Sequence, residues 1–259
     1  GVWYDNEDVV GGGPIQFIQY IRGCSVADAF AFARDWLRLD GARRPAPSSA
    51  TSQPAEPDDA ARIARARQIW AESVPIAGAL AERYLVEHRA IPAPALVALD
   101  GADVLRFHAR FRAYHRGRLH PALVAVVTGT AGDIVAVHAV RLDPRTAGKI
   151  EGTAKGSAGP VGRGAFRIPG RGGTLLTEGI EDALSVYAAT GRPVMAALGS
   201  MAGPLKTLPD GAVITVCQQR DPAGKPTAKK LTAAMDAAVA RGCRISVALP
   251  PEDVKDAND

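Results

Sequence analysis

Residues 175–185 read LLTEGIEDALS and place an acidic residue, Glu178, between an apolar run and a helix-like pattern. The run 174–177 is short and mostly apolar, which predicts a buried strand. From position 180 to 189 apolar residues recur at helical spacing, so a helix is expected directly after the strand. Because ligands of sheets built from such units collect beyond the carboxyl ends of the strands, Glu178 is expected at a functional edge.

The same alternation continues to the C-terminus. Further strands are expected over 194–197, 212–217 and 244–249, and further helices over 200–208 and 227–241. Strands that alternate with helices predict a parallel sheet with helices on both faces, that is, an α/β fold. Polar or acidic residues also follow the later strands, among them Gln219, Asp221 and Asp256.

The spacing of the acidic residues suits a metal site. Asp182 lies four residues after Glu178, one helical turn along, so both carboxylates point toward the same edge. Clustered carboxylates raise one another's proton affinity, and a divalent cation relieves their repulsion. Oxygen ligands with no His or Cys nearby favour Mg²⁺ or Mn²⁺ over zinc. The alternative, that each acid caps the following helix, stays open on the pattern alone.

The composition is that of an ordinary globular chain. Its 259 residues are 47% hydrophobic and 22% charged, which is enough for one large domain or two smaller ones. No apolar run approaches the length of a membrane span, and no signal pattern opens the chain, so a cytoplasmic location away from membranes is expected. Cys24, Cys217 and Cys243 are far apart, so neither a disulfide framework nor a zinc site is expected from them.

Positive charge is concentrated between positions 101 and 174. Twelve basic and four acidic residues give this segment a charge of +8, whereas the whole chain has +4. The segment suits a polyanion, although a solvated basic face that aids solubility explains the charge as well. Its arginines alternate with Phe107, Phe111 and Tyr114, and such rings can stack on the bases of a single strand. Alternatively, Phe107 and Phe111 are core residues of a strand.

Four segments follow from composition and periodicity. Residues 1–40 predict a short strand, a glycine turn and two helices. Residues 41–59 lack periodicity and are rich in Ala, Pro and Ser, which predicts a flexible linker. Residues 60–170 predict a basic α+β subdomain, and residues 171–259 contain the alternating strands and helices.

Within the basic subdomain, a hairpin is the clearest expected element. The apolar runs 122–127 and 134–140 are separated by a turn that contains glycine. Two helices and a strand over 104–107 precede the hairpin. The segment 149–164 is rich in Gly, Ala and Lys, so an exposed loop is expected there.

Residues 174–259 resemble the Toprim domain of primases, topoisomerases and related nucleases. TEGIEDALS resembles its glutamate motif, QRDPAG at 219–224 its Asp-x-Asp-x-x-Gly motif, and KDAND at 255–259 the closing motif of primase members. Residues 60–168 resemble the basic subdomain that precedes Toprim in primases of phages, plasmids and mobile elements. Residues 1–39 resemble the end of a primase zinc ribbon with the helix pair after it. The ribbon's metal ligands are absent from this sequence, so zinc is not expected.

The resemblance implies roles for the acidic residues. Glu178 would be the general acid or base, or a metal ligand, while Asp182 and Asp221 would be catalytic residues that ligate Mg²⁺. Asp256 would help to hold a second ion. Gln219 stands where the family has its first Asp, and it offers a neutral carbonyl oxygen in place of a charge. The lost charge leaves catalytic competence open.

The resemblance further implies a primase-type nucleotidyltransferase that joins nucleotides on a single-stranded DNA template with Mg²⁺ or Mn²⁺. The cations expected to contact DNA or nucleoside triphosphates are Arg106, Arg110, Arg112, Arg116, Arg118, Lys149, Lys155 and Lys255. Lys149 and Lys155 are the best placed for a triphosphate. A replicative helicase would be a further partner. Two alternatives remain: a catalytically weak Toprim module that binds single-stranded DNA or a helicase, and a Toprim nuclease.

Overall fold

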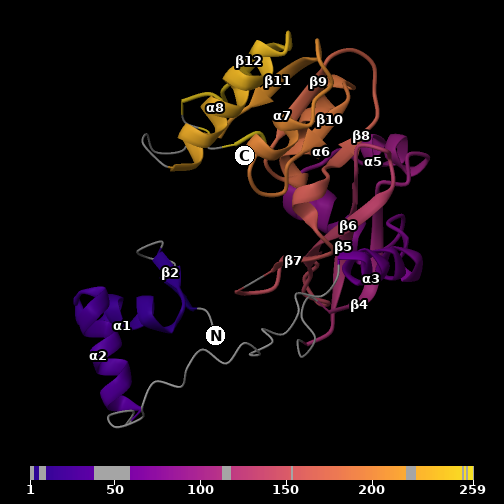
Figure 1. Cartoon of the computed structure of the whole chain (residues 1–259). Coiled ribbons are helices and arrows are strands. Elements are labelled where there is room, and N and C mark those ends of the chain that lie inside the picture. The colour runs from indigo at the N-terminus through magenta and orange to yellow at the C-terminus, as the bar shows by residue number, and fades with distance from the viewer. Residues whose placement is uncertain are drawn as a thin grey trace. The chain divides into compact units, whose positions relative to one another are not determined.

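The computed structural model describes residues 3–5, 10–37, 59–112, 118–152, 154–219, 226–252, 254 and 256–258. The chain forms two compact units, Gly1–Ala55 and Glu56–Asp259 (Figure 1). The linker expected over 41–59 lies outside the described residues up to position 58. Within the described ranges, no helix combines the length and the apolar character that a membrane crossing requires.

The first unit pairs two short strands and two helices. Its elements are β1 (Trp3–Asp5), β2 (Val10–Gly12), α1 (Pro14–Arg22) and α2 (Val26–Trp36). Ser25 Oγ accepts a hydrogen bond from the backbone nitrogen of Asp28 at 3.2 Å, which caps the start of α2. Gly11 and Gly12, expected in a turn, instead pair with Tyr4 and Trp3 as part of β2. A zinc ribbon is not confirmed by these residues.

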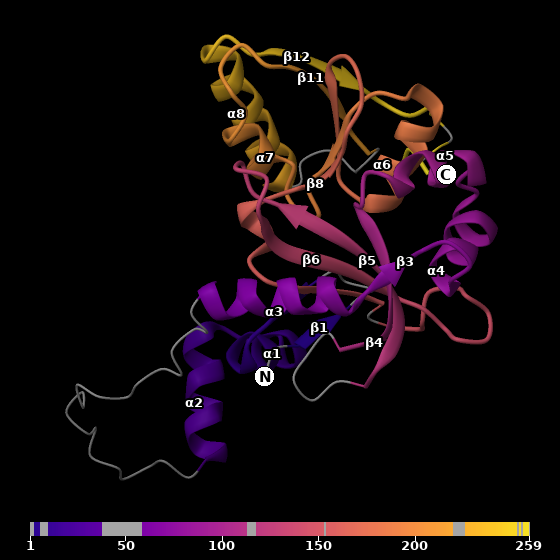
Figure 2. The same cartoon turned by 90° about the vertical axis from the view of Figure 1, so that its right-hand side faces the viewer.

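The second unit begins with an α+β subdomain on a five-stranded antiparallel sheet, in the order β3-β4-β5-β6-β7. Its elements are α3 (Asp59–Glu72), β3 (Val74–Pro75), α4 (Leu80–Arg83), the π-helix η1 (Tyr84–His88), α5 (Ala93–Asp100), β4 (Leu105–Phe111), β5 (His120–Thr128), β6 (Ile134–Arg141), β7 (Lys155–Ala158) and the 3₁₀ helix η2 (Val161–Arg163). The predicted hairpin is confirmed as β5 and β6, and α3 lies along the sheet beside β6 (Figure 2).

The prediction of an exposed loop over 149–164 is wrong in part. Its middle pairs with β6 as β7, because the backbone of this small-residue segment continues the sheet at its edge. Gly159 follows β7 with φ of +89°, and a Cβ atom there would lie 2.4 Å from the carbonyl oxygen of Val135. Only glycine allows this approach without displacement of the backbone. Lys155 therefore belongs to a strand rather than to a free loop.

The C-terminal part of this unit is built on a second five-stranded sheet, in the order β12-β11-β9-β10-β8. Its elements are β8 (Phe166–Ile168), β9 (Thr174–Thr177), α6 (Ile180–Thr190), β10 (Val194–Ala196), α7 (Ala202–Lys206), β11 (Val213–Cys217), α8 (Pro226–Ala240) and β12 (Arg244–Ala248). The strands β10, β9, β11 and β12 are parallel, and β8 runs antiparallel to β10. The predicted parallel sheet is confirmed.

Different helices cover the two faces of this sheet, since successive side chains of a strand point to opposite faces. Leu175 belongs to the hydrophobic cluster that contains Leu184 of α6. The next residue, Leu176, belongs to a second cluster with Leu205 of α7 and Ala234 of α8. Both faces are therefore buried, as a parallel sheet requires.

The two parts of the second unit share one hydrophobic core. Phe166 and Ile168 of β8 lie in the C-terminal sheet, yet they belong to the same cluster as Val124 and Val126 of β5. Each buried methylene contributes about 0.8 kcal/mol to such packing. The core therefore fixes where upstream side chains lie relative to the carboxyl ends of the C-terminal strands.

Candidate functional site

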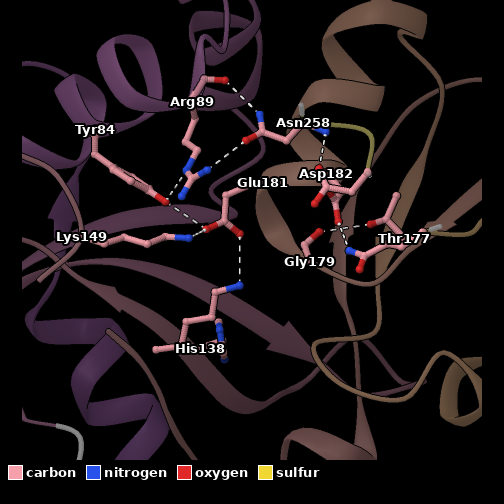
Figure 3. A network of polar contacts seen from close by, with 12 residues as sticks. Tyr84, Arg89, His138, Lys149, Thr177, Gly179, Glu181, Asp182 and Asn258 are labelled. Atoms are coloured by element: carbon pink, nitrogen blue, oxygen red, sulfur yellow. Dashed lines mark hydrogen bonds and ion pairs between the residues drawn. The ribbon is translucent and has the colours of Figure 1, made fainter. Parts of the chain in front are cut away.

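A cavity of about 310 Å³ lies at the carboxyl ends of β9, β10 and β11, where the two parts of the second unit meet. Four acidic residues of the C-terminal part line it: Glu178, Asp182 and Asp256, which form what we call the carboxylate wall, and Glu181. Three cations of the upstream subdomain form the basic wall: Arg89, Lys149 and Lys155. Figure 3 shows how side chains from both parts point toward one another. A ligand in this cavity would meet both signs of charge.

The turn after β9 presents Glu178 to the cavity. The backbone nitrogen of Leu198 donates to the carbonyl oxygen of Glu178 at 2.9 Å, and Thr177 Oγ1 donates to that of Gly179 at 3.2 Å. A Cβ atom at Gly179 would lie 3.3 Å from Oδ2 of Asp182 and would crowd that carboxylate. Acidic residues in the first turn of α6 are favoured by the positive end of the helix dipole.

Asp182 is the most constrained member of the carboxylate wall. It is 6% exposed, and Gln219 Nε2 donates to its Oδ2 at 3.2 Å. Burial, together with the negative charge of Asp256, raises the pKa of Asp182 to about 6. Carboxyl groups that oppose one another's ionisation favour a bound cation. Among the described residues, no three His, Cys, Asp or Glu side chains are grouped as a metal site, and Asp221 lies outside those residues.

Glu181 was not among the predicted site residues, yet it is the centre of an ion-pair network (Figure 3). Lys149 Nζ lies 2.8 Å from its Oε1, and Lys155 Nζ lies 3.7 Å from its Oε2. The hydroxyl of Tyr84 donates to Oε1 at 2.9 Å. Burial opposes ionisation of Glu181, but Lys155 and Lys149 outweigh it and lower the pKa of Glu181 to about 2. The sequence feature that could have indicated Glu181 is its position directly before Asp182.

Tyr84, Arg89 and Asn258 join the two parts around this network. Arg89 Nε donates to the Tyr84 hydroxyl at 2.9 Å, and Asn258 Nδ2 donates to the carbonyl oxygen of Arg89 and to Ser185 Oγ, both at 2.9 Å. Burial and the charge of Glu181 raise the pKa of Tyr84, so its hydroxyl stays protonated and donates. Tyr84 begins the π-helix η1, and π-helical turns are frequent at functional sites.

His138 of β6 lies beside the basic wall. Its Nδ1 is 2.8 Å from Ser157 Oγ, a contact between β6 and β7. Burial and the positive charge of Lys155 lower the pKa of His138 to about 4. Burial also lowers the pKa of Lys149, against the opposing effect of Glu181. His138 is therefore a neutral side chain at pH 7.

Only part of the predicted cation set lines the cavity. Lys149 and Lys155 do, whereas the lining contains none of the four described arginines of the set, Arg106, Arg110, Arg112 and Arg118. Arg106 donates to Asp103 and to the carbonyl oxygen of Trp70, and its guanidinium lies 4.5 Å from the Trp70 ring. These contacts hold β4 against α3. Arg116, Asp221 and Lys255 lie outside the described residues.

The aromatic residues between those arginines belong to the core. Phe111 is 1% exposed, and Phe107 is partly buried against the main hydrophobic cluster. The Phe111 ring therefore has no face available for a nucleic-acid base. The core interpretation is confirmed for Phe111, Phe107 packs against the core while partly exposed, and Tyr114 lies outside the described residues.

Family models match both parts of the second unit. A Toprim domain model matches residues 174–259, and a domain of unknown function (DUF7146) matches residues 60–168. The solved DnaG catalytic core is similar at 13% identity and a TM-score of 0.51, over 77% of this chain and 73% of that chain. No curated protein matches the chain.

Two further solved structures are similar. A DNA primase domain from Pseudomonas aeruginosa shares 16% identity with a TM-score of 0.40, over 67% of this chain and 56% of that chain. The DnaG primase catalytic domain bound to single-stranded DNA shares 13% identity with a TM-score of 0.47, over 77% of this chain and 74% of that chain.

The fold and the matched model define a class. The C-terminal third is a Toprim domain, with its sheet and its acidic cavity in the positions described above. More particularly, 77% of this chain shares the fold of the DnaG catalytic core.

Proposed function

We propose that this protein is a primase-type nucleotidyltransferase, which makes short primers on single-stranded DNA in the replication of a phage, plasmid or mobile element. The observation that supports the proposal most strongly is the cavity itself, in which a carboxylate wall faces a basic wall. A nucleoside triphosphate needs both, because its phosphates require cations and its transfer requires a base and metal ligands. A replicative helicase would be a further partner.

In the proposed reaction, the 3′-hydroxyl oxygen of one nucleotide forms a bond to the α-phosphorus of the next, and the bond to pyrophosphate breaks. Glu178, which lines the cavity at the end of β9, takes the hydroxyl proton. Lys149 and Lys155 bind the phosphate oxygens and stabilise the charge that develops on the leaving group. The shared core holds the two walls in place, so little reorganisation is needed.

The carboxylate wall fits Mg²⁺ or Mn²⁺. Asp182 and Asp256 oppose one another's ionisation, and the carbonyl oxygen of Gln219 would be a further, neutral metal ligand. Mg²⁺ in such sites takes one or two protein carboxylates and completes its shell with water and substrate phosphates. When bound, the ion would neutralise phosphate charge in the transition state. Asp182, Asp256 and Asp221 would hold it, with Glu178 beside them.

A template-dependent primer assay with Mg²⁺ tests the proposal. Glu178→Gln keeps the size of the side chain and removes the base, so primer synthesis is expected to fall by about a hundredfold or more. Glu151→Gln is a matched control, because Glu151 is an exposed glutamate that does not line the cavity. If wild type and Glu178→Gln made equally little product, the proposal would be lost.

One contact favours a second candidate function. Gln219 donates to Asp182 where the family has a further carboxylate, so the chain has one fewer charged metal ligand. A catalytically weak module that binds single-stranded DNA or a helicase fits that loss. Such a module would bind DNA without making primers. A nuclease, by contrast, would cleave labelled DNA without any synthesis, and the same incubation distinguishes the three outcomes.

A further inference from the structure

The network around Glu181 is not explained by the proposed reaction. The Glu181 side chain is 9% exposed, and its partners among the described residues, Tyr84, Lys149 and Lys155, all come from the upstream subdomain. Glu181 itself belongs to the first turn of α6, directly before Asp182 of the carboxylate wall. Glu181 therefore contacts the basic wall, although it belongs to the same helix as Asp182 of the carboxylate wall.

We propose that Glu181 is a positioning residue, which holds Lys149 and Lys155 in the cavity so that both can bind the phosphates of an incoming nucleoside triphosphate. As far as the reaction is concerned, this inference rests on the proposed function. It adds a residue that neither touches the reacting atoms nor binds the metal. Glu181 acts through the two lysines.

Charge repulsion supplies the first argument. Lys149, in the segment between β6 and β7, and Lys155, the first residue of β7, line the same cavity, and Arg89 adds a third positive charge. Like charges at short range in a partly buried site repel strongly. The Lys149 side chain is only 27% exposed, so water screens it incompletely. The Glu181 carboxylate, with one oxygen toward each lysine, offsets this repulsion.

Hydrogen-bond capacity supplies the second argument. An ammonium group has three N–H donors, and Glu181 needs one from each lysine. The remaining donors of both lysines are available to phosphate oxygens in the cavity that they line. The Tyr84 hydroxyl fixes the orientation of the carboxylate, and Arg89 in turn donates to that hydroxyl. Glu181 therefore orients the cations without using up their capacity to bind an anion.

The test measures the lysines directly and does not depend on catalysis. The full chain is acetylated with an N-hydroxysuccinimide ester, and the rate at each lysine is followed by mass spectrometry. In Glu181→Gln, acetylation of Lys149 and Lys155 is expected to rise about tenfold, the size of a typical coupling between contacting charged groups. The exposed Lys206 and Lys229 are internal references, and Glu151→Gln is the matched control. Equal rates in wild type and Glu181→Gln would overturn the inference.

A second variant guards against misfolding. Tyr84→Phe removes one hydrogen bond to Glu181 and leaves every charge in place, so a rise of about two- to threefold at Lys149 is expected from the loss of one neutral donor. Should Glu181→Gln fail to fold, as seen by thermal unfolding, this variant decides the question. No rise at Lys149 in a folded Tyr84→Phe protein would then overturn the inference.

Primer synthesis separates positioning from a merely structural role. Glu181→Gln is expected to raise KM for nucleoside triphosphates about tenfold and also to lower kcat, because the displaced lysines bind the phosphates and stabilise the leaving group. An unchanged KM contradicts the positioning role. If wild type makes no primers, the proposed function fails, and the acetylation rates still decide whether Glu181 holds the lysines.

Discussion

Two groups of cations in the upstream subdomain have the same charge and different surroundings. Lys149 and Lys155, the inner pair, line the cavity and contact a buried carboxylate of the Toprim domain. Arg110, Arg112 and Arg118, the outer arginines, are exposed at the end of β4 and before β5, and they do not line the cavity. The sequence places all five in the same +8 segment, and it favours only Lys149 and Lys155 as contacts of a triphosphate.

The difference indicates two kinds of ligand contact. The inner pair faces the carboxylate wall across a cavity of about 310 Å³, a size that suits a single small molecule. Exposed arginines on a strand end suit a polymer, whose phosphates they can follow over the surface. Replacement of one cation from each group should therefore change different measurements.

The largest expected effect is on catalysis by the inner pair. Lys149→Met removes a charged donor from the cavity, and primer synthesis should fall by about a hundredfold, as for other preorganised donors to a transition state. Lys206→Met, on the exposed side of α7, is the control and should have no effect. A loss of less than about threefold in Lys149→Met would mean that the inner pair does not act on the reacting phosphates.

The surroundings of the inner pair also predict a pH effect through His138. Its folded-state pKa of about 4 lies below the ordinary value of 6.5, so the folded protein binds this proton less readily than the unfolded chain. Stability is therefore lost as pH falls from 6.5 through 4, and His138 accounts for at most about 2 kcal/mol of that loss at pH 5. Urea unfolding at pH 7.5 and pH 5 measures it. The His138→Gln protein should lose correspondingly less stability between the two pH values, and an identical loss in both proteins contradicts a partly buried, neutral histidine.

On the opposite wall, Gln219→Asp should strengthen metal binding. The change places a further carboxylate, in addition to Asp256, beside Asp182, where the amide of Gln219 now donates a hydrogen bond. Mn²⁺ affinity, measured by calorimetry, should rise about tenfold, because ligand charge largely sets the affinity of oxygen-ligand sites. Gln218→Asp is the matched control, one residue away and outside the cavity lining. A gain in both affinity and primer synthesis favours a decayed site, whereas no gain favours a working variant.

The smallest expected effect belongs to the outer arginines. Arg110→Gln should weaken single-stranded DNA binding a few-fold for every template sequence and reduce the slope of log affinity against log salt by about 0.7, the value for one phosphate contact. Fluorescence anisotropy at several salt concentrations measures both. Lys149→Met should leave that slope nearly unchanged. If the two variants changed the slope equally, the distinction between inner pair and outer arginines would disappear.

The carboxylate wall could be predicted because it follows from local patterns and one topological rule. The strand β9 and the helix α6 are recognisable from periodicity, and they fix Glu178 and Asp182 on one edge. Parallel strands then bring their carboxyl ends together, which predicts that Gln219 and Asp256 join them from distant positions. The four residues do line one cavity.

Lys149 and Lys155 of the basic wall were predicted, but Arg89 and the geometry of the wall could not be, because they depend on packing between distant segments. Tyr84 contacts Glu181 across 97 residues of sequence, and no periodicity links the two. Lys155 was assigned to a loop because small residues surround it, although edge pairing with β6 turns the segment into a strand. Lys149 and Arg106 have the same charge, yet Lys149 lines the cavity whereas Arg106 holds β4 to α3. Charge in the sequence does not distinguish these two roles.

The central claim is that one nucleotide lies between the two walls, and a crystal structure with Mn²⁺ and a non-hydrolysable nucleoside triphosphate tests it most directly. The account predicts anomalous density at Asp182 and Asp256, beside Glu178, with triphosphate oxygens within hydrogen-bond distance of Lys149 and Lys155. Manganese away from those carboxylates, or a triphosphate bound only at the outer arginines, would contradict it.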